Sequence, residues 1–147
     1  MKVLVIGDSH GNIANLKHVV GFAKNMNAGA IIHCGDWNNL ESVETILEYK
    51  IPLYSCLGNA DIDPLMKEKF KEYLEIELDG KKIYIVHKFL KNDKKYIGKD
   101  VCFTGHLHSQ KMWEIDGVKI VRPGALENNI SFAVYDTVTD KIEFINN

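Results

Sequence analysis

Short apolar runs that each end in a polar turn constrain the fold of this chain more than any other feature. Lys2–Ile6 (KVLVI) and Ala30–His33 (AIIH) have the continuous apolar character of strands buried on both faces. Residues 52–57 form a third such run. The segments between these runs carry apolar residues at helical spacing. Strands that alternate with helices predict parallel βαβ units with right-handed crossovers.

Three helices are expected between and after these strands. Asn12 can cap the first helix, and Pro64 suits the first position of the third because its missing N–H would have no partner there. The first two helices each show one apolar stripe, made of Ile13, Leu16, Val19, Val20 and Ala23 in one and of Leu40, Val43, Ile46 and Leu47 in the other.

From residue 72 the pattern changes to short strands, several of them joined by tight turns such as Asp79-Gly80 and Asp116-Gly117. We expect strands at 74–78, 81–86, 100–103, 112–115, 118–121, 131–135 and 141–145. An α/β first half and an antiparallel second half predict an α/β protein with two packed sheets flanked by helices. The 147 residues suffice for one core and not for two, so we expect a single domain over 1–147.

Five of the expected strands end in residues that bind metals or polar ligands. The strand ends are Gly7-Asp8-Ser9-His10, Gly35-Asp36, Gly58-Asn59, His87 and Gly105-His106-Leu107-His108. Ligands of open α/β sheets bind outside the carboxyl ends of the strands. These side chains are therefore expected to converge, although they are far apart in the sequence.

The donor set is two aspartates, one asparagine and four histidines, without cysteine. Such oxygen and imidazole donors suit manganese, iron, zinc or nickel better than a structural zinc site. Seven ligands exceed the needs of one tetrahedral site, whereas two metals that share a carboxylate would use them all. Asp8 and His10 are two residues apart, as are His106 and His108, so on extended backbone each pair would point the same way.

The order GDSH, GD, GN, H and GHLH resembles that of the calcineurin-like metallophosphoesterases, and the short chain is most similar to their small single-domain bacterial and archaeal phosphodiesterases. The resemblance runs from residue 3 to about residue 125. It implies a two-sheet αββα sandwich with mixed parallel and antiparallel strands, and a dinuclear metal site. By motif position, one metal would be held by Asp8, His10 and His108, the other by Asn59, His87 and His106, and Asp36 would bridge.

The charge balance agrees with metal-assisted phosphoester chemistry. Arg122 is the one arginine among 18 basic residues, so guanidinium groups cannot be the main binders of phosphate. Two divalent cations would supply the missing positive charge, and a metal-bridging hydroxide could attack phosphorus in line. We therefore expect a dinuclear phosphodiesterase with two divalent ions, Mn²⁺ first, with Ni²⁺, Fe²⁺ and Zn²⁺ as alternatives. The alternatives in function are a scaffold or binding protein on the same fold, as for relatives in vesicle-coat assemblies, and a phosphomonoesterase for small metabolites.

The chain departs from the family pattern at two positions beside the ligands. Most relatives have a histidine after the asparagine, as a candidate proton donor to the leaving group, and here that position is Ala60. Asp61 is our substitute candidate for this acid, acting through a water. Lys88 follows His87 where relatives usually have glycine, and residues 87–105 are shorter than in many relatives, which predicts a missing helix and a more open site. Asn12, Lys88 and Arg122 are the candidates for substrate contacts.

Other residues are expected to be structural or to have no special role. We interpret His18 and His33 as structural histidines, while Trp37 could either stack on a base or aryl group or pack in the core. Cys34, Cys56 and Cys102 are an odd, scattered set, so we expect reduced core thiols.

The composition also limits the partners. The net charge of -2 predicts no broad basic face for nucleic acid or anionic lipid. No apolar run is long enough for a membrane span, and no signal peptide is recognisable, so we expect a cytoplasmic protein. The expected partner is a small phosphate ester, including nucleotide-derived or nucleic-acid-derived diesters. A homodimer is left open.

Overall fold

The first of two sheets carries the predicted parallel strands of the N-terminal half. The computed structural model describes all residues 1–147, and the order of this sheet is β10 (Lys141–Asn146), β9 (Ser131–Asp136), β1 (Lys2–Ile6), β2 (Ala30–His33) and β3 (Leu53–Ser55). Strands β1, β2 and β3 are parallel, with Val5 beside Ile32 and His33 beside Ser55, and β9 runs antiparallel to β1. Consequently the three parallel strands end at the same edge of the sheet.

The second sheet is mixed, which corrects the expectation of an antiparallel second half. Its order is β4 (Tyr73–Leu78), β5 (Lys81–Val86), β6 (Val101–Thr104), β8 (Val118–Pro123) and β7 (Gln110–Ile115). The hairpins β4–β5 and β7–β8 are antiparallel as predicted, but β5, β6 and β8 are mutually parallel. The Asp-Gly turns predict each hairpin, because they join neighbouring strands. They do not predict that β6 lies between the two hairpins and pairs in parallel with β5 and β8.

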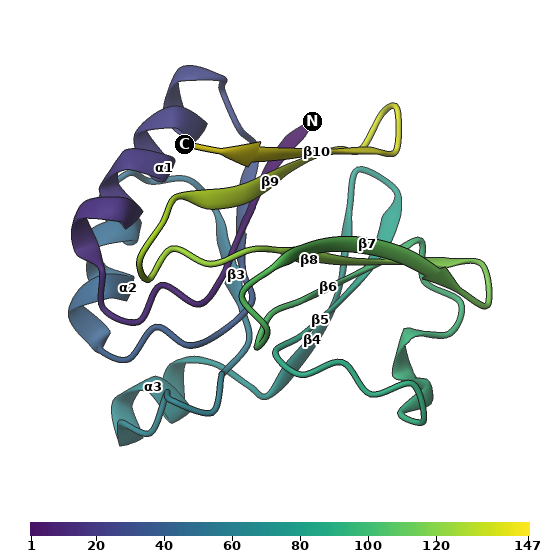
Figure 1. Ribbon diagram of the computed structural model, residues 1–147, viewed down its shortest axis with the longest axis horizontal. Coiled ribbons are helices and arrows are strands. Elements are labelled where there is room, and N and C mark those ends of the chain that lie inside the picture. The colour runs from purple at the N-terminus through teal and green to yellow at the C-terminus, as the bar shows by residue number, and fades with distance from the viewer.

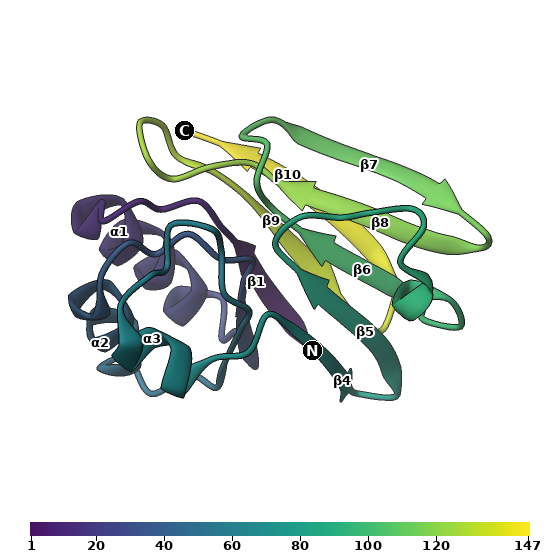
Figure 2. The ribbon, with the colours of Figure 1, turned by 90° about the horizontal axis from the view of Figure 1, so that it is seen from below.

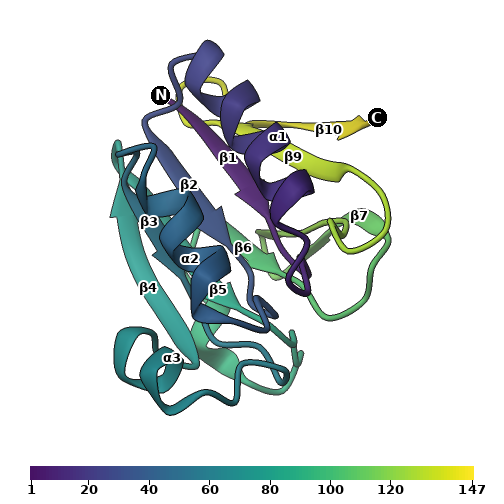
Figure 3. The same ribbon diagram turned by 90° about the vertical axis from the view of Figure 1, so that its left-hand side faces the viewer.

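Helices cover one face of the sandwich far more completely than the other. Helices α1 (Ile13–Asn25) and α2 (Leu40–Leu47) lie on the outer face of the first sheet, with α3 (Pro64–Lys69) below them (Figures 1 and 3). Figure 2 shows the two sheets side by side, with only the short turn η1 (Lys94–Tyr96) on the outer face of the second. The two-sheet sandwich is thus confirmed, and its second outer layer is reduced where the sequence predicted a missing helix.

The sequence of β1 explains how the layers are held together. Val3 and Val5 pack between the two sheets with residues such as Phe103, while Leu4 and Ile6 face the helices. All four side chains are fully buried. Each contributes about 1.5 to 3 kcal/mol through burial of apolar surface, which explains why this run is apolar on both faces.

Strand β3 is shorter than predicted. The ladder with β2 ends at Ser55. The Cys56 N–H still donates to the His33 carbonyl at 3.4 Å, but Cys56 and Leu57 then pair with Lys71. The Leu57 N–H donates to the Lys71 carbonyl at 2.8 Å. This early exit from the sheet frees the segment that starts at Gly58 to enter the site described below.

The remaining structural expectations concern the cysteines and membrane spans. Cys34, Cys56 and Cys102 are all free and buried, which confirms the prediction of reduced core thiols. None of the helices combines the length and the apolar character that crossing a bilayer requires.

Candidate metal centre

All seven predicted ligands meet at one edge of the sandwich, where loops leave the carboxyl ends of five strands. They come from the turn after β1, the turn after β2, the segment after β3, and the ends of β5 and β6. The polar atoms fall into two adjoining groups, the first made of Asp8, His10 and His108 and the second of Asp36, Asn59, His87 and His106.

The first group surrounds one carboxylate oxygen. Asp8 Oδ1 lies 3.9 Å from His10 Nε2 and 3.7 Å from His108 Nε2. Asp8 is fully buried, and this oxygen has no hydrogen-bond partner. An unpaired buried carboxylate oxygen is costly, and imidazole nitrogens aimed at it are the donors that a divalent metal needs. The geometry therefore fits a cation between these three side chains.

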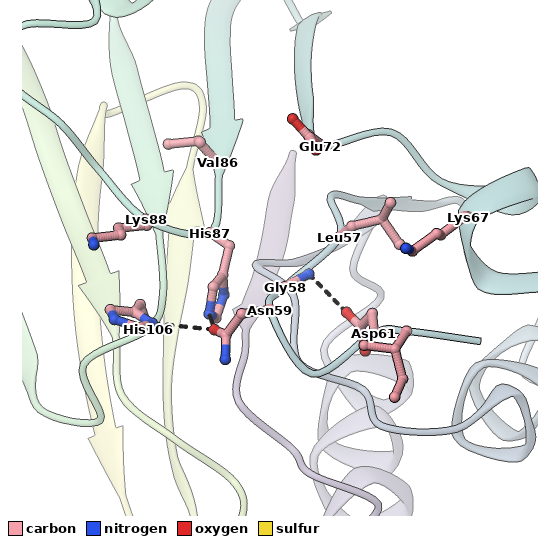
Figure 4. A pocket seen from close by; sticks show the side chains of 11 residues that line it. Leu57, Gly58, Asn59, Asp61, Lys67, Glu72, Val86, His87, Lys88 and His106 are labelled. Carbon is pink, nitrogen blue, oxygen red and sulfur yellow. Dashed lines mark hydrogen bonds between the residues drawn. The ribbon is translucent and has the colours of Figure 1, made fainter. Parts of the chain in front are cut away.

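The second group surrounds Asp36 and Asn59. His87 Nε2 lies 3.2 Å from Asp36 Oδ2 and 3.0 Å from Asn59 Oδ1, and His106 Nδ1 lies 3.3 Å from the same amide oxygen. Figure 4 shows His87, Asn59 and His106 pointing toward one another from three segments of the chain. These donors fit a second cation.

Asp36 lies between the two groups. Its Oδ2 is 3.5 Å from His10 Nε2 as well as 3.2 Å from His87 Nε2. Its other oxygen accepts a hydrogen bond from the Ala60 N–H at 2.8 Å. One carboxylate oxygen is thus held by the protein backbone while the other faces histidines of both groups, as a bridging ligand requires.

The ligands lie on tightly turned backbone, which corrects the explanation by extended chain. Asp8, His10, Asp36 and His106 have φ values of 49°, 43°, 67° and 74°, all in the left-handed region. Such conformations are costly for residues other than glycine and cluster at functional sites. His106 and His108 also point to different groups, so the spacing of two does not bring them to the same metal.

Two glycines allow the loops to approach this closely. A Cβ at Gly58 would lie 2.1 Å from Asp36 Oδ1, and a Cβ at Gly105 would lie 2.9 Å from Asp8 Oδ2. The glycines of the GN and GH motifs therefore make room for the two carboxylates. Any larger residue would push Asp36 or Asp8 away from the histidines.

Two imidazoles are oriented by hydrogen-bond acceptors behind them, and a third faces a carboxylate at longer range. His87 Nδ1 is 2.8 Å from the Cys34 carbonyl, and His10 Nδ1 is 3.0 Å from Asn38 Oδ1. His108 Nδ1 faces the Glu127 carboxylate at 3.7 Å. A proton on Nδ1 leaves the Nε2 lone pair free toward the centre, which is the tautomer that binds metal. Asn38 and Glu127 were not predicted from the sequence, because their role depends on contacts across the fold.

The electrostatics of the metal-free site are unbalanced. Burial raises the pKa of Asp8 to about 7, against the lowering effect of His87. Burial also acts to raise the pKa of Asp36, but hydrogen bonds from His87 and the Ala60 N–H outweigh it and bring the pKa below its ordinary value. Burial would lower the pKa of His87, yet its bond to Asp36 raises it. Without cations, protons have to compensate part of the buried negative charge.

The chain as a whole matches a known protein family. Residues 1–140 match the calcineurin-like phosphoesterase superfamily domain. The chain belongs to this superfamily. The predictions of a calcineurin-like fold and of a phosphoric ester hydrolase are therefore confirmed, and calcineurin-like phosphoesterases use divalent metal ions.

Relatives of known fold agree with this assignment. Phosphodiesterase MJ0936 of Methanocaldococcus jannaschii is 25% identical over 138 residues, which cover 84% of this chain and 83% of that protein. The structure of an archaeal phosphodiesterase has a TM-score of 0.84 at 22% identity and covers all of both chains. Vacuolar protein sorting 29 from Cryptosporidium parvum has a TM-score of 0.71 at 20% identity, with 99% of this chain and 96% of that chain covered. The last two similarities establish the fold.

Asp61 occupies a different place in this calcineurin-like site from the one expected of a proton donor. Its side chain is buried and lies behind Gly58 (Figure 4). Four backbone N–H groups donate to its two oxygens at 2.7 to 3.0 Å, from Asp36, Trp37, Asn38 and Gly58. Each oxygen accepts two of these bonds. Asp61 therefore ties the turn that carries Asp36 to the segment that carries Asn59.

Two hollows flank the metal-binding groups. The larger hollow, about 620 Å³, lies toward α3 and is lined by Leu57, Gly58, Asn59, Asp61, Ile62, Lys67, Glu72, Val86, His87, Lys88 and His106. A second one of about 280 Å³, which we term the aromatic hollow, is lined by Lys88, Phe89, Thr104, Gly105, His106, Leu107, Trp113 and Arg122. Lys88 and His106 line both. The candidate metal site of this phosphoesterase thus opens in two directions.

The three predicted substrate contacts have different surroundings. Lys88 is exposed between the hollows, and Arg122 lines the aromatic hollow. Asn12 lies outside both hollows. Its Oδ1 caps α1 by accepting from the Asn15 N–H at 3.0 Å, and its Nδ2 donates to the Glu127 carbonyl at 2.7 Å. These contacts give Asn12 a structural role, and we do not propose it as a substrate contact.

His33 and Trp37, which were set apart from the ligands, are explained by packing, whereas His18 lies at the surface. His33 is fully buried, accepts from the Gly35 N–H on Nδ1 at 3.0 Å and faces Ser9 Oγ at 2.9 Å with Nε2. Trp37 is fully buried and stacks on His33 with ring centroids 3.6 Å apart, so the packing alternative holds for Trp37. His18 is exposed on α1, with Nε2 3.1 Å from Asn147 Nδ2.

Proposed function

We propose that this chain is a two-metal phosphodiesterase. The observation that carries the proposal is the convergence of seven oxygen and imidazole donors in two adjoining groups. Asp36 contacts histidines of both groups, and the buried Asp8 Oδ1 has no hydrogen-bond partner. Family membership and the name of the archaeal relative support the reaction class. By this proposal Asp8, His10 and His108 hold one cation, Asn59, His87 and His106 the other, and Asp36 both.

The cations would supply positive charge for the phosphoryl oxygens and an acidified water as the source of the attacking hydroxide. The chain contributes rigid positions for the donors. Backbone bonds fix Asp36 through Ala60 and orient His87 through the Cys34 carbonyl. This arrangement also explains how a chain with Arg122 as its one arginine can bind a phosphate ester, since the metals take over the role of guanidinium groups.

The two hollows support a diester substrate over a monoester. A phosphodiester carries two organic groups, and the larger hollow and the aromatic hollow meet at His106 and Lys88. A monoester would leave one of them without an occupant. Nucleotide-derived and nucleic-acid-derived diesters are the natural chemical class that carries two such groups.

The environment of Ala60 supports esters with good leaving groups. No imidazole follows Asn59, and a positioned general acid is worth roughly 10² to 10⁴-fold in rate. Asp61 has both oxygens committed to backbone N–H groups, so we withdraw it as the acid and propose it as a positioning residue. Alkyl esters, which need protonation most, are then expected to react slowly.

The donor chemistry supports Mn²⁺ as the leading metal, with Ni²⁺, Fe²⁺ and Zn²⁺ as alternatives, because no thiolate is present in either group. The cytoplasmic location and the homodimer stay predictions.

Hydrolysis of an activated aryl phosphodiester by protein loaded with Mn²⁺ or Ni²⁺ tests the proposal. Asp36→Ala should abolish turnover, because it removes the ligand common to both groups, whereas Asp93→Ala, on an exposed loop, should not. Turnover that persists in Asp36→Ala would refute the mechanism. A metal content near zero after reconstitution would favour the alternative of a scaffold protein, and faster turnover of monoesters than diesters would favour the phosphomonoesterase.

A further inference from the structure

The aromatic hollow combines apolar and cationic side chains beside a proposed metal ligand. Phe89, Leu107 and Trp113 supply its apolar wall, and Lys88 and Arg122 supply positive charge next to His106. Leu107 lies between the ligands His106 and His108 and is 56% exposed. Because Leu107 lines the hollow together with Phe89 and Trp113, it adds to a contiguous apolar surface, and such surfaces mark ligand-binding grooves.

Trp113 is the centre of this wall. It is half-buried on β7, the edge strand of the second sheet, and Phe89 meets it edge to face with ring centroids 6.0 Å apart. Lys111 Nζ and Arg122 Cζ lie 5.0 and 5.7 Å from the centre of its ring. An indole with cations around it attracts a ligand that has both an aromatic ring and a negative charge.

Arg122 is held in place beside that ring. Its Nε donates to the Ser109 carbonyl at 2.8 Å and an Nη donates to Ser109 Oγ at 2.9 Å. A guanidinium has five N–H groups, so others remain for a ligand. The single arginine of the chain is thus fixed at the border between the indole and His106.

The larger hollow lacks this character. Its wall holds Lys67, Glu72 and Ile62 but no phenylalanine, tyrosine or tryptophan, and its two imidazoles belong to the proposed metal ligands His87 and His106. Lys67 and Glu72 lie on the side away from Lys88 and His106 (Figure 4). An aromatic group of a substrate would therefore find a stacking partner on one side of the metal centre only.

We propose that the aromatic hollow binds an aromatic ester group of the substrate, an aryl ring or a nucleobase, against Trp113, with its phosphate directed to His106 and Arg122. The inference rests on the proposed phosphodiesterase function and deepens it, because it assigns the aromatic half of a diester to one hollow. The other ester group then occupies the larger hollow.

Binding of simple phosphates to the Zn²⁺-loaded protein tests the assignment. Phenyl phosphate and methyl phosphate differ only in the ring, and uridine 5′-monophosphate and ribose 5-phosphate differ only in the base. Stacking on an indole should make the aromatic member of at least one pair bind about tenfold more tightly. The pair that shows the preference distinguishes an aryl site from a nucleobase site.

Fluorescence gives a readout that does not depend on turnover. The chain has two tryptophans, and Trp37 is fully buried against His33, so a ligand-dependent change in emission reports on Trp113. We expect aromatic phosphates to quench this emission and the aliphatic ones to leave it nearly unchanged. Trp113→Phe should keep much of the binding preference and lose the signal.

Trp113→Ala should remove the preference for aromatic phosphates. The matched control is Tyr73→Ala, which removes a partly exposed aromatic side chain with a lysine 5.0 Å above its ring, on β4 at the opposite edge of the same sheet (Figure 2). This control should leave the preference intact. Trp113→Leu, which keeps an apolar residue on β7, replaces the alanine variant if that variant fails to fold.

Three results would separate a failure of the aromatic site from a failure of the proposed phosphodiesterase function. A preference that survives in Trp113→Ala or Trp113→Leu, or equal binding of both members of each pair by the wild-type protein, would overturn the assignment. A Trp113-dependent preference without hydrolysis of any diester would refute the proposed function and leave the aromatic site standing. Diester hydrolysis without the preference for aromatic phosphates would support the proposed function and refute the aromatic site.

Discussion

Replacing Asp61 with asparagine removes one acceptor atom from the carboxylate that joins the Asp36 turn to the Asn59 segment. Each carboxylate oxygen accepts two backbone N–H groups, Oδ2 from Asp36 and Gly58 and Oδ1 from Trp37 and Asn38. In asparagine one oxygen becomes an NH₂ group, which cannot accept. Whichever way the amide is turned, two N–H groups lose their partner and face another donor.

The expected cost follows from this count. A hydrogen bond to a charged group contributes roughly 1.5 to 3 kcal/mol, and Asp61 is only 2% exposed, so water cannot replace the lost partner. Two lost bonds therefore reduce the free energy of unfolding by about 3 to 6 kcal/mol. Domains of this kind are stable by about 5 to 15 kcal/mol in total, so the variant should be marginal at room temperature.

Urea denaturation of the metal-free protein measures this loss directly, and metal titration of the folded variant measures its effect on the site. We expect weaker binding of both cations, because the bridging Asp36 and the ligand Asn59 lose their common anchor. Asp63→Asn is the control. Asp63 lies two residues away and caps α3 with a single bond to the Leu65 N–H, and asparagine caps a helix as well as aspartate does.

The two interpretations of Asp61 differ in outcome. A proton donor acting through water would lose turnover of alkyl esters on substitution but keep the stability and the metal affinity of the wild type. A loss of less than 1 kcal/mol together with unchanged binding of two metals would refute the positioning role.

Further predictions concern the ligand loops. Gly58→Ala places a Cβ 2.1 Å from Asp36 Oδ1. It should lower metal affinity at least tenfold, as measured by calorimetry, and the free energy of unfolding by about 1 to 3 kcal/mol, as measured by urea denaturation. Unchanged values would mean that the loops can separate freely. Metal affinity should be present at pH 8 and lost as the pH falls through about 7, because the raised pKa of Asp8 lets a proton compete for its carboxylate; a flat profile between pH 6 and 8 would contradict this. Ala60→His should raise turnover of alkyl diesters by at least tenfold and that of activated aryl diesters little; equal turnover of alkyl esters before and after would disprove the proton-donor explanation.

The ligand positions could be predicted because each one follows a strand. The runs that end at Ile6 and His33 identify the strands, and parallel strands bring their carboxyl ends together, so convergence of Asp8 and Asp36 follows from the order of elements alone. The same reasoning could not give the conformation of the turns. A φ of 49° at Asp8 and 67° at Asp36 reflects bonds between the two turns, such as the one from the Asp8 N–H to the Gly35 carbonyl at 3.0 Å.

The aromatic hollow and the true place of Asp61 were beyond prediction for a related reason. Trp113 lines the same hollow as His106 only because β7 pairs with β8 and β8 with β6, and the parallel β6–β8 pairing leaves no signal in the sequence. The environment of Asp61 depends on four N–H groups from two loops that meet only in the folded chain. An aspartate next to a ligand motif looks catalytic when the N–H groups that donate to it cannot be counted.

Such a count separates the three buried aspartates of the site by function. Asp61 accepts hydrogen bonds from four backbone N–H groups, so both of its oxygens are fully paired, as suits a structural anchor. Asp36 has one N–H donor on one oxygen, and the other oxygen faces histidines. Asp8 accepts one bond from the His106 N–H on Oδ2 and none on Oδ1, and its pKa is raised to about 7. Asp36 and Asp8 thus have fewer hydrogen-bond donors than Asp61, and Asp8 Oδ1 has none. Their unpaired oxygens lie where the imidazole nitrogens point. A cation is the partner that satisfies both sides at once, because it offers positive charge to the carboxylates and accepts the lone pairs of the imidazole nitrogens.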